Sequence, residues 1–233
     1  MKQPLLFNSL PVSVSTADGV EPDQATIETV PNLRGASIAD AVRFGGPAVS
    51  RILERMPIHC DRRYVIVDTK VAYLMQGWSP SIPGWHTDGV PRGAEGDARD
   101  KGAPNLRAMI DDSMTAPRFH LYVSGTHCPT EFLEGMFMQQ VDMDAEDDRS
   151  LYSSMDTTVN TLLDIEYAAW STFRTQPDRI YTWDWWSVHR AIPAEDTGWR
   201  LLIRVTETDY IPPRTEGFIR RQNQVYIPQG FGW

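Results

Sequence analysis

The sequence predicts a mainly β fold with a few flanking helices. Three observations support this fold class. Short runs of β-branched and aromatic residues recur along the chain, and 16 Gly and 17 Pro punctuate them. Residues 200–207 have the two-residue period of a strand, with Arg200 and Arg204 on one face and aliphatic residues on the other. With 233 residues, of which 41% are hydrophobic, the chain suits one large domain. We therefore expect a single domain over 1–233, with a core at 62–208, a flank at 1–61 and an extension at 209–233.

The flank combines irregular and helical sequence. Residues 1–35 are rich in Pro, Ser, Thr, Asp and Val, which is typical of irregular or edge-strand structure. From Ser37 to Met56, apolar residues recur at helical spacing, which predicts a helix. Gly45-Gly46-Pro47 interrupts this pattern, and because Pro clashes in a helix interior we expect two short helices.

Runs of β-branched and aromatic residues predict the strands of the core. They lie at 64–68, 71–75, 119–123, 179–183 and 200–207. In the last strand, Arg200 and Arg204 share one face, and three aliphatic side chains share the other. A strand of this kind indicates a functional interior and a packed exterior.

The segments between these strands are expected to be loops, or are left open. Residues 77–92 are rich in Gly and Pro, which is typical of a structured loop. Residues 93–112 are polar and residues 139–150 contain five acidic side chains, so both are interpreted as surface loops and as candidate lids over a substrate. Residues 157–173 have mixed periodicity and fit either a strand or a short helix.

Composition argues against several classes of protein. The formal net charge of −9 does not favour nucleic acid, because phosphate binding needs clustered Lys and Arg. No apolar run approaches the roughly 18 residues of a membrane-spanning helix, and the first residues do not resemble a signal peptide. Two cysteines, Cys60 and Cys128, are too few for a disulfide framework in a chain of this size. We expect a cytoplasmic protein that does not bind membranes, and its oligomeric state stays open.

Two segments carry the residue types of a metal site. His86-Thr87-Asp88 places an imidazole and a carboxylate two residues apart, between an expected strand and a loop rich in Gly and Pro. His189 follows the strand at 179–183 and adds a second imidazole. Two imidazoles and one carboxylate on one face of an octahedral metal leave three positions open, which suits the oxygen chemistry of Fe(II). The alternatives are a solvated turn at 86–88 and a core histidine at 189, with His120 and His127 as rival ligands.

Two arginines follow on the alternating strand. Arg200 lies eleven residues after His189 and could bind a carboxylate through two parallel hydrogen bonds. Its alternative is a structural ion pair with Asp184, Glu195 or Asp196. Arg204, on the same face, either meets a negatively charged group of a substrate or pairs with a carboxylate such as Asp184.

The order His-x-Asp, distal His, then Arg on the next strand resembles the Fe(II)/2-oxoglutarate-dependent dioxygenase superfamily. The match lies at His86, Asp88, His189 and Arg200, and the run 188–206 is similar to the distal segment of that family. The resemblance implies a double-stranded β-helix, which is a cupin-like jelly roll. It further implies Fe(II) held by the two histidines and the aspartate, with O2 and 2-oxoglutarate as co-substrates. Arg200 would bind the distal carboxylate of 2-oxoglutarate, assisted by Thr130 or Thr126.

The resemblance also implies an activity. A member of this superfamily is an oxidoreductase, and we expect a hydroxylase that acts on a small-molecule substrate and releases succinate and CO2. Trp85, next to His86, and Arg204 are the candidate substrate contacts. The alternatives are modification of a protein side chain or of a nucleic-acid base, to which the pairs Arg62-Arg63 and Arg220-Arg221 could offer phosphate contacts. A cupin-like metalloenzyme that needs no 2-oxoglutarate and a non-catalytic jelly-roll protein also stay open.

Overall fold

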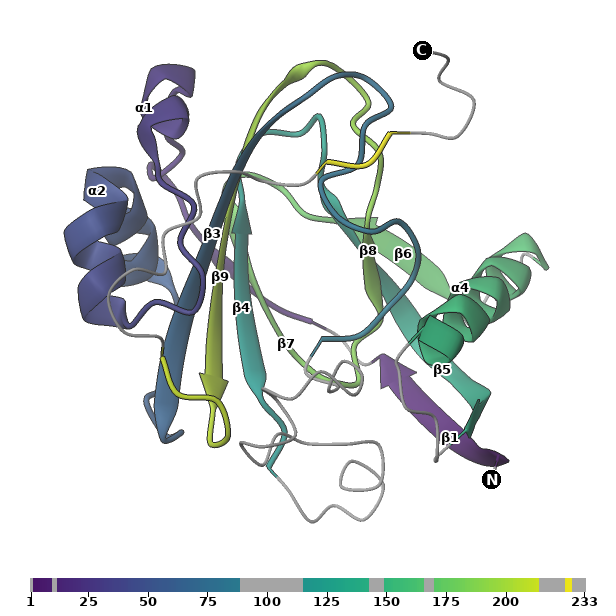
Figure 1. Cartoon of the computed structure of the whole chain (residues 1–233). Coiled ribbons are helices and arrows are strands. Elements are labelled where there is room, and N and C mark those ends of the chain that lie inside the picture. The colour runs from purple at the N-terminus through teal and green to yellow at the C-terminus, as the bar shows by residue number, and fades with distance from the viewer. Residues whose placement is uncertain are drawn as a thin grey trace.

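In a computed structural model, the chain forms two antiparallel β-sheets that pack face to face, with helices on their outer faces (Figure 1). The structure describes residues 2–9, 12–88, 115–142, 149–165, 170–213 and 225–227. The mainly β fold class predicted from the sequence is confirmed.

The larger sheet has five strands. Their order across the sheet is β2 (Ser13–Thr16), β7 (Arg179–Asp184), β4 (Arg118–Val123), β9 (Gly198–Thr208) and β3 (Tyr64–Leu74). β3 and β9 pair along their full length, from Tyr64 opposite Thr208 to Leu74 opposite Gly198. The alternation of β9 therefore places Leu201, Ile203 and Val205 on one face, where they pack beneath the helices, and Arg200 and Arg204 on the other.

Two helices cover the outer face of this sheet. They are α1 (Gln24–Thr29) and α2 (Ile38–Arg55), and the side chains of Asp23 and Ser37 cap their N-termini. Gly46 breaks the helical geometry of α2 with φ of 79° and ψ of −177°, a conformation that glycine adopts readily. The interruption predicted at Gly45-Gly46-Pro47 is confirmed.

The smaller sheet contains β1 (Lys2–Ser9), β5 (Thr130–Asp142) and β6 (Ser171–Arg174), and the short strand β8 (His189–Ala191) also pairs with β5. The helix α4 (Arg149–Asp164) packs on its outer face. Leu151, Met155 and Val159 recur at four-residue spacing along α4 and contact Phe137 and other apolar residues of the sheet.

Aromatic side chains fill the space between the two sheets. Phe119 of β4 and Trp183 of β7 stack at 5.5 Å between ring centroids, and Phe132 of β5 meets Trp183 edge-on at 5.2 Å. Phe132 also stacks on Phe173 of β6 at 5.3 Å. These contacts join the sheets near β8, the strand that begins with His189.

Two predicted boundaries are corrected, and one segment that the sequence left open is assigned. The two strands expected at 64–68 and 71–75 form the single strand β3, because the intervening Thr69 and Lys70 also pair with β9. The loop expected at 139–150 is in part regular structure, since β5 continues to Asp142 and α4 begins at Arg149. Residues 157–173 contain the second half of α4 and the start of β6.

The N-terminal flank contributes to both sheets. β1 pairs with β5 and β2 pairs with β7, each at the edge of its sheet, which confirms the edge-strand interpretation for 2–9 and 13–16. The helix α1 within residues 1–35 was not predicted. The candidate lid at 93–112 lies outside the described residues, as do residues 143–148 of the other one. No helix in the described ranges is long and apolar enough to cross a membrane.

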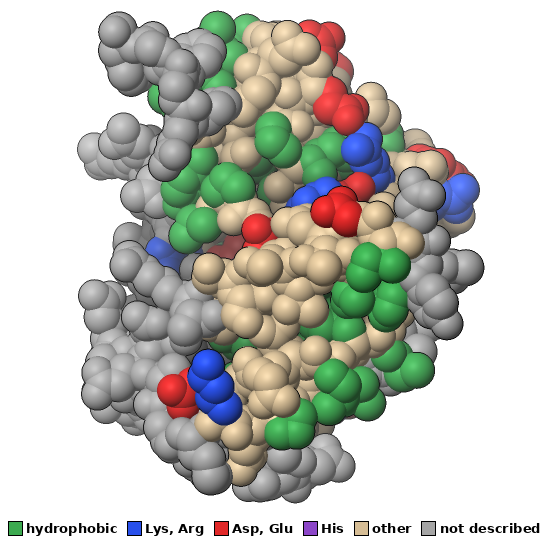
Figure 2. All heavy atoms as spheres, turned by 90° about the vertical axis from the view of Figure 1, so that its right-hand side faces the viewer, with side chains coloured by type: hydrophobic (Ala, Val, Ile, Leu, Met, Phe, Trp, Pro, Cys, Tyr) green, Lys and Arg blue, Asp and Glu red, His purple; other side chains and the backbone are tan. Residues whose placement is uncertain are grey.

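On the side that carries α4 and β1, hydrophobic side chains reach the surface in several places, and those of Leu6 and Met138 are about half exposed (Figure 2).

A buried ionic cluster ties β9 and β4 to the segment that follows α2. The carboxylate of Glu207 is fully buried and accepts a hydrogen bond from Arg118 at 3.0 Å and one from His120 Nε2 at 2.9 Å. It also accepts the backbone N–H groups of His59 and Cys60, at 3.1 and 2.8 Å. One buried carboxylate thus accepts hydrogen bonds from two side chains and two backbone N–H groups.

Candidate metal centre

His86 and His189 are partners in a backbone bridge. Each backbone N–H donates to the carbonyl of the other at 2.9 Å, and the two imidazole rings lie 4.7 Å apart between centroids. The loop after β3 and the start of β8 are far apart in the chain, and this bridge brings them into contact.

Asp88 completes the cluster. One ligand atom from each of His86, Asp88 and His189 lies within 4.8 Å of the others, and the Asp88 carboxylate is 3.5 Å from His189 Nε2. Asp88 and His189 are buried, and His86 is partly exposed. The structure therefore brings the three predicted metal ligands together at one point.

The hydrogen bonds of the two imidazoles orient them as ligands. Nδ1 of His86 lies 3.0 Å from the carbonyl of Gly84, and Nδ1 of His189 lies 3.2 Å from the carbonyl of Ser187. Because a carbonyl only accepts, each Nδ1 carries the proton and each Nε2 keeps its lone pair. Histidines that bind metals are typically held in this way.

Arg204 holds the carboxylate of Asp88. Its guanidinium donates to Asp88 and to Asp68 of β3, at 3.0 Å each. Burial alone would raise the pKa of Asp88, but the charge of Arg204 above all holds it well below its usual value. The carboxylate partners of Arg204 are thus Asp88 and Asp68, whereas the sequence suggested Asp184. A contact between Arg204 and a substrate stays a prediction.

The helix α4 fixes the loop that carries His86 and Asp88. Asp156 accepts the backbone N–H of Trp85 at 2.9 Å, Asn160 accepts its indole N–H at 3.1 Å, and Tyr152 donates to the carbonyl of Thr87 at 2.8 Å. These three residues of α4 lie on one face of the helix, four residues apart. Their spacing is the sequence signal that could have linked α4 to the site.

Gly84 is required at the start of this loop. It has φ of 112°, and a Cβ at this position would lie 3.3 Å from the carboxylate of Asp156. The loop can therefore approach α4 closely enough for Trp85 to reach Asp156 only with glycine at this position.

Trp85 has a structural position. Its side chain is fully buried in the apolar cluster beneath α4, and the guanidinium of Arg190 lies 4.3 Å from its ring. No described contact directs it toward a substrate, so the role predicted for Trp85 has no support in the part of the chain that the structure describes.

We expect Asp156→Ala to weaken metal binding about 10- to 100-fold, the usual effect of removing a residue that orients a metal ligand. Without Asp156 the N–H of Trp85 loses its acceptor, and the segment carrying His86 and Asp88 is released from α4. Asp164→Ala, an exposed position near the end of the same helix, is the matched control. Titration of Mn(II) into both variants measures the effect, and equal affinities would show that α4 does not position the loop.

Arg200 is a buried cation without an acidic partner in the described ranges. The residue is 2% exposed, its Nε donates to the carbonyl of Cys128 at 2.7 Å, and its Nη2 lies 3.4 Å from the hydroxyl of Thr130. Of the two candidate helpers, the structure places Thr130 beside Arg200, whereas Thr126 is exposed.

The three carboxylates considered as partners of Arg200 have other contacts. Asp184 accepts the backbone N–H of Trp186, Glu195 pairs with Arg174 at 2.7 Å, and Asp196 accepts the backbone N–H of Thr197. Burial lowers the pKa of the Arg200 guanidinium.

The rival histidines lie outside the cluster. His120 uses both ring nitrogens, because Nε2 donates to Glu207 and Nδ1 accepts the hydroxyl proton of Thr182 at 2.8 Å. His127 lies against Gly125 and Gly198. Among the described residues, neither histidine belongs to the group that could hold a metal.

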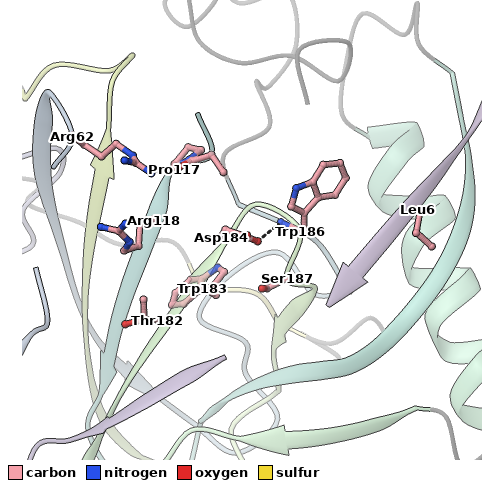
Figure 3. A pocket seen from close by; sticks show the side chains of 10 residues that line it. Leu6, Arg62, Pro117, Arg118, Thr182, Trp183, Asp184, Trp186 and Ser187 are labelled. Atoms are coloured by element: carbon pink, nitrogen blue, oxygen red, sulfur yellow. Dashed lines mark hydrogen bonds between the residues drawn. The ribbon is translucent and has the colours of Figure 1, made fainter. Parts of the chain in front are cut away.

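A cavity of about 560 Å³ is lined by residues of β1, β4 and β7, among them Leu6, Arg118 and Trp183 (Figure 3). Two of its lining residues contact His189: the Trp183 ring lies 5.4 Å from the imidazole, and the carbonyl of Ser187 accepts its Nδ1 proton. Arg62 and Arg118 line the side of the cavity away from Leu6 (Figure 3). Both arginines pair with Asp61, so their charges are compensated within the protein.

The sequence did not single out Asp68 and Lys70 of β3. Both are charged residues two positions apart within an apolar strand, which indicates a face turned toward a polar interior. That pattern was the available signal.

No protein-family model, curated protein or solved structure matches this chain.

Proposed function

We propose that this protein is an Fe(II)- and 2-oxoglutarate-dependent oxygenase with a double-stranded β-helix core. One observation carries the proposal: the cluster of His86, Asp88 and His189 lies in the same interior as the buried guanidinium of Arg200, which has no carboxylate partner among the described residues. A metal-ligand group together with an unpaired buried cation suits a ligand that chelates a metal at one end and carries a carboxylate at the other.

The donor set fits Fe(II). Two imidazoles with protonated Nδ1 atoms and one ionised carboxylate supply three ligands and leave positions for a co-substrate and O2. His86, Asp88 and His189 would hold the ion, which supplies the oxygen-activating redox chemistry when bound.

The protein positions the co-substrate through β9. Arg200 and Arg204 lie on one face of this strand, four residues or roughly 13 Å apart at about 3.3 Å per residue. Arg204 orients the metal ligand Asp88, and Arg200 binds the far carboxylate of 2-oxoglutarate. Bound 2-oxoglutarate would then lie between Arg200 and Asp88, with its 2-oxo end toward the histidines.

The cavity that Trp183 and Ser187 line would receive a small-molecule substrate. Trp183 forms part of its wall and also contacts the imidazole of His189, so a substrate on this surface would be separated from that metal ligand by one side chain. Rings and aliphatic groups can pack on the indole, which excludes water from the reacting atoms. Succinate, CO2 and a hydroxylated substrate are the expected products.

We expect Arg200→Ala to weaken 2-oxoglutarate binding at least tenfold. A buried, hydrogen-bonded charge pair that loses one partner costs roughly 2–5 kcal/mol. Arg200→Lys should restore only part of the affinity, because an ammonium does not reproduce the planar fork of donors. Calorimetric titration of 2-oxoglutarate into the Mn(II)-loaded protein measures the change.

The matched control is Arg179→Ala, which removes a partly exposed arginine of β7 that pairs with Asp178. If 2-oxoglutarate binds neither the wild-type protein nor the variants, a metalloenzyme that uses no 2-oxoglutarate replaces this proposal. If it binds the wild type and Arg200→Ala equally, another residue holds the carboxylate.

A further inference from the structure

Lys70 lies close to Arg200 on the interior face of the larger sheet. Across the β3–β9 pair, Ala72 is opposite Arg200 and Lys70 is opposite Leu202. Lys70 is therefore a diagonal neighbour of Arg200 on the same face, at a separation that long side chains can bridge.

Lys70 itself is partly buried. Its ammonium donates to the carbonyl of Pro80, in the segment that leads from β3 to His86. Burial, and then the charge of Arg200, lower the pKa of Lys70 to about 8, and Cys128 acts in the opposite direction. The two cations thus repel each other in a region with little water.

No carboxylate in the described ranges pairs with either cation. Asp68, two residues away on the same strand, is bound to Arg204 and to the backbone N–H of Gly35. Two neighbouring cations in a buried place are unfavourable unless an anion joins them. The ammonium has three donors and the guanidinium five, and only one bond of Lys70 and two bonds of Arg200 go to described residues.

We propose that Lys70 is a second binding residue for the distal carboxylate of the co-substrate, and that it forms with Arg200 and the Thr130 hydroxyl a subsite selective for 2-oxo dicarboxylates. This inference rests on the proposed function and names a determinant of its co-substrate specificity. Lys70 and Arg200 approach the carboxylate from neighbouring strands, so one oxygen can meet the ammonium while the other meets the guanidinium. A 2-oxo monocarboxylate has no group that can relieve the repulsion between the two cations.

The test compares Lys70→Met with the wild type in the Mn(II)-loaded protein. The two titrants are 2-oxoglutarate and 2-oxopentanoate, which lacks the distal carboxylate. We expect Lys70→Met to weaken 2-oxoglutarate binding at least tenfold and to change 2-oxopentanoate binding less than twofold. Lys70→Arg should keep most of the affinity for 2-oxoglutarate. Lys2→Met, at an exposed lysine of β1, is the matched control.

A second measurement needs only the wild-type protein. With a pKa of about 8, Lys70 is charged well below that pH, so affinity for 2-oxoglutarate should be constant there and fall as the pH rises through about 8. Among its neighbours, Arg200 stays charged over this range and Cys128 stays a thiol, because burial raises the pKa of Cys128. The affinity of 2-oxopentanoate should not follow this profile.

The outcomes separate the two proposals. Equal 2-oxoglutarate affinity in Lys70→Met and the wild type, or a flat profile across pH 8, overturns the role of Lys70 and leaves the proposed function standing. Parallel weakening of both ligands shows that Lys70 supports the fold of the site and also overturns the subsite. If the wild type does not bind 2-oxoglutarate at all, the proposed function and this inference both fail.

Discussion

His189→Ala should abolish stoichiometric binding of Fe(II) or Mn(II) and with it the metal-dependent formation of succinate. The variant keeps only two of the three ligand side chains and loses one of the two imidazole donors that suit Fe(II). β8 should persist, because His189 pairs with His86 and with Phe132 through backbone groups that alanine also has. Metal content after dialysis and succinate production measure the loss, and far-ultraviolet circular dichroism verifies the fold.

His127→Ala is the control, since this histidine is partly buried and lies outside the metal-ligand group. Full metal content in His189→Ala would contradict the assignment of the centre. His120 would not be an adequate substitute, because both of its ring nitrogens bind protein groups.

Glu207→Ala should lower the free energy of unfolding by about 3–5 kcal/mol, the usual effect of removing one partner from a buried ion pair. The carboxylate is fully buried, and its loss leaves the charge of Arg118 with one partner fewer. The N–H groups of His120, His59 and Cys60 also lose their acceptor. Urea denaturation followed by tryptophan fluorescence measures the change.

Glu195→Ala provides the comparison. Its carboxylate pairs with Arg174, but both side chains are about half exposed, so we expect a change of about 0–1 kcal/mol. Similar losses in the two variants would show that the Glu207 cluster contributes no more than a surface ion pair.

The same cluster predicts how stability depends on pH. Burial lowers the pKa of His120, so the unfolded chain takes up this proton first and stability falls as the pH drops below about 6.5. Burial would raise the pKa of Glu207, but the hydrogen bonds from His120, Arg118 and two backbone N–H groups lower it overall. Its contribution is present above about pH 4.5 and is lost as the pH falls through the lower folded value. Glu207→Ala should therefore lack the acid loss of stability that comes from protonation of Glu207.

Local periodicity was enough to predict the elements with a regular apolar pattern. The alternation at 200–207 identifies β9, and the interrupted helix at 37–56 identifies α2 with its break at Gly46. The same method divides β3 in two, because Thr69 and Lys70 are polar and interrupt the apolar run. Their pairing with β9 comes from the partner strand, which periodicity within β3 does not record.

Residue type was enough to nominate the ligands of the candidate metal centre. His86, Asp88 and His189 were selected because imidazole and carboxylate groups bind metals and because each lies near the end of an expected strand. Arg204 shows the limit of this reasoning. Its position on the Arg200 face is readable from the alternation, but its two bonds depend on which strand lies beside β9 and on where the loop from 84 to 88 returns.

The sequence by itself determined the fold class, the face of β9 that carries the two arginines and the residue types of the metal site. These features depend on spacing within a few residues, which the covalent chain sets directly. Only the tertiary structure decided the partners: His86 with His189, Arg204 with Asp88 and Asp68, and Lys70 beside Arg200. Strand register and the packing of α4 on the smaller sheet set these contacts, and both are properties of residues far apart in the chain.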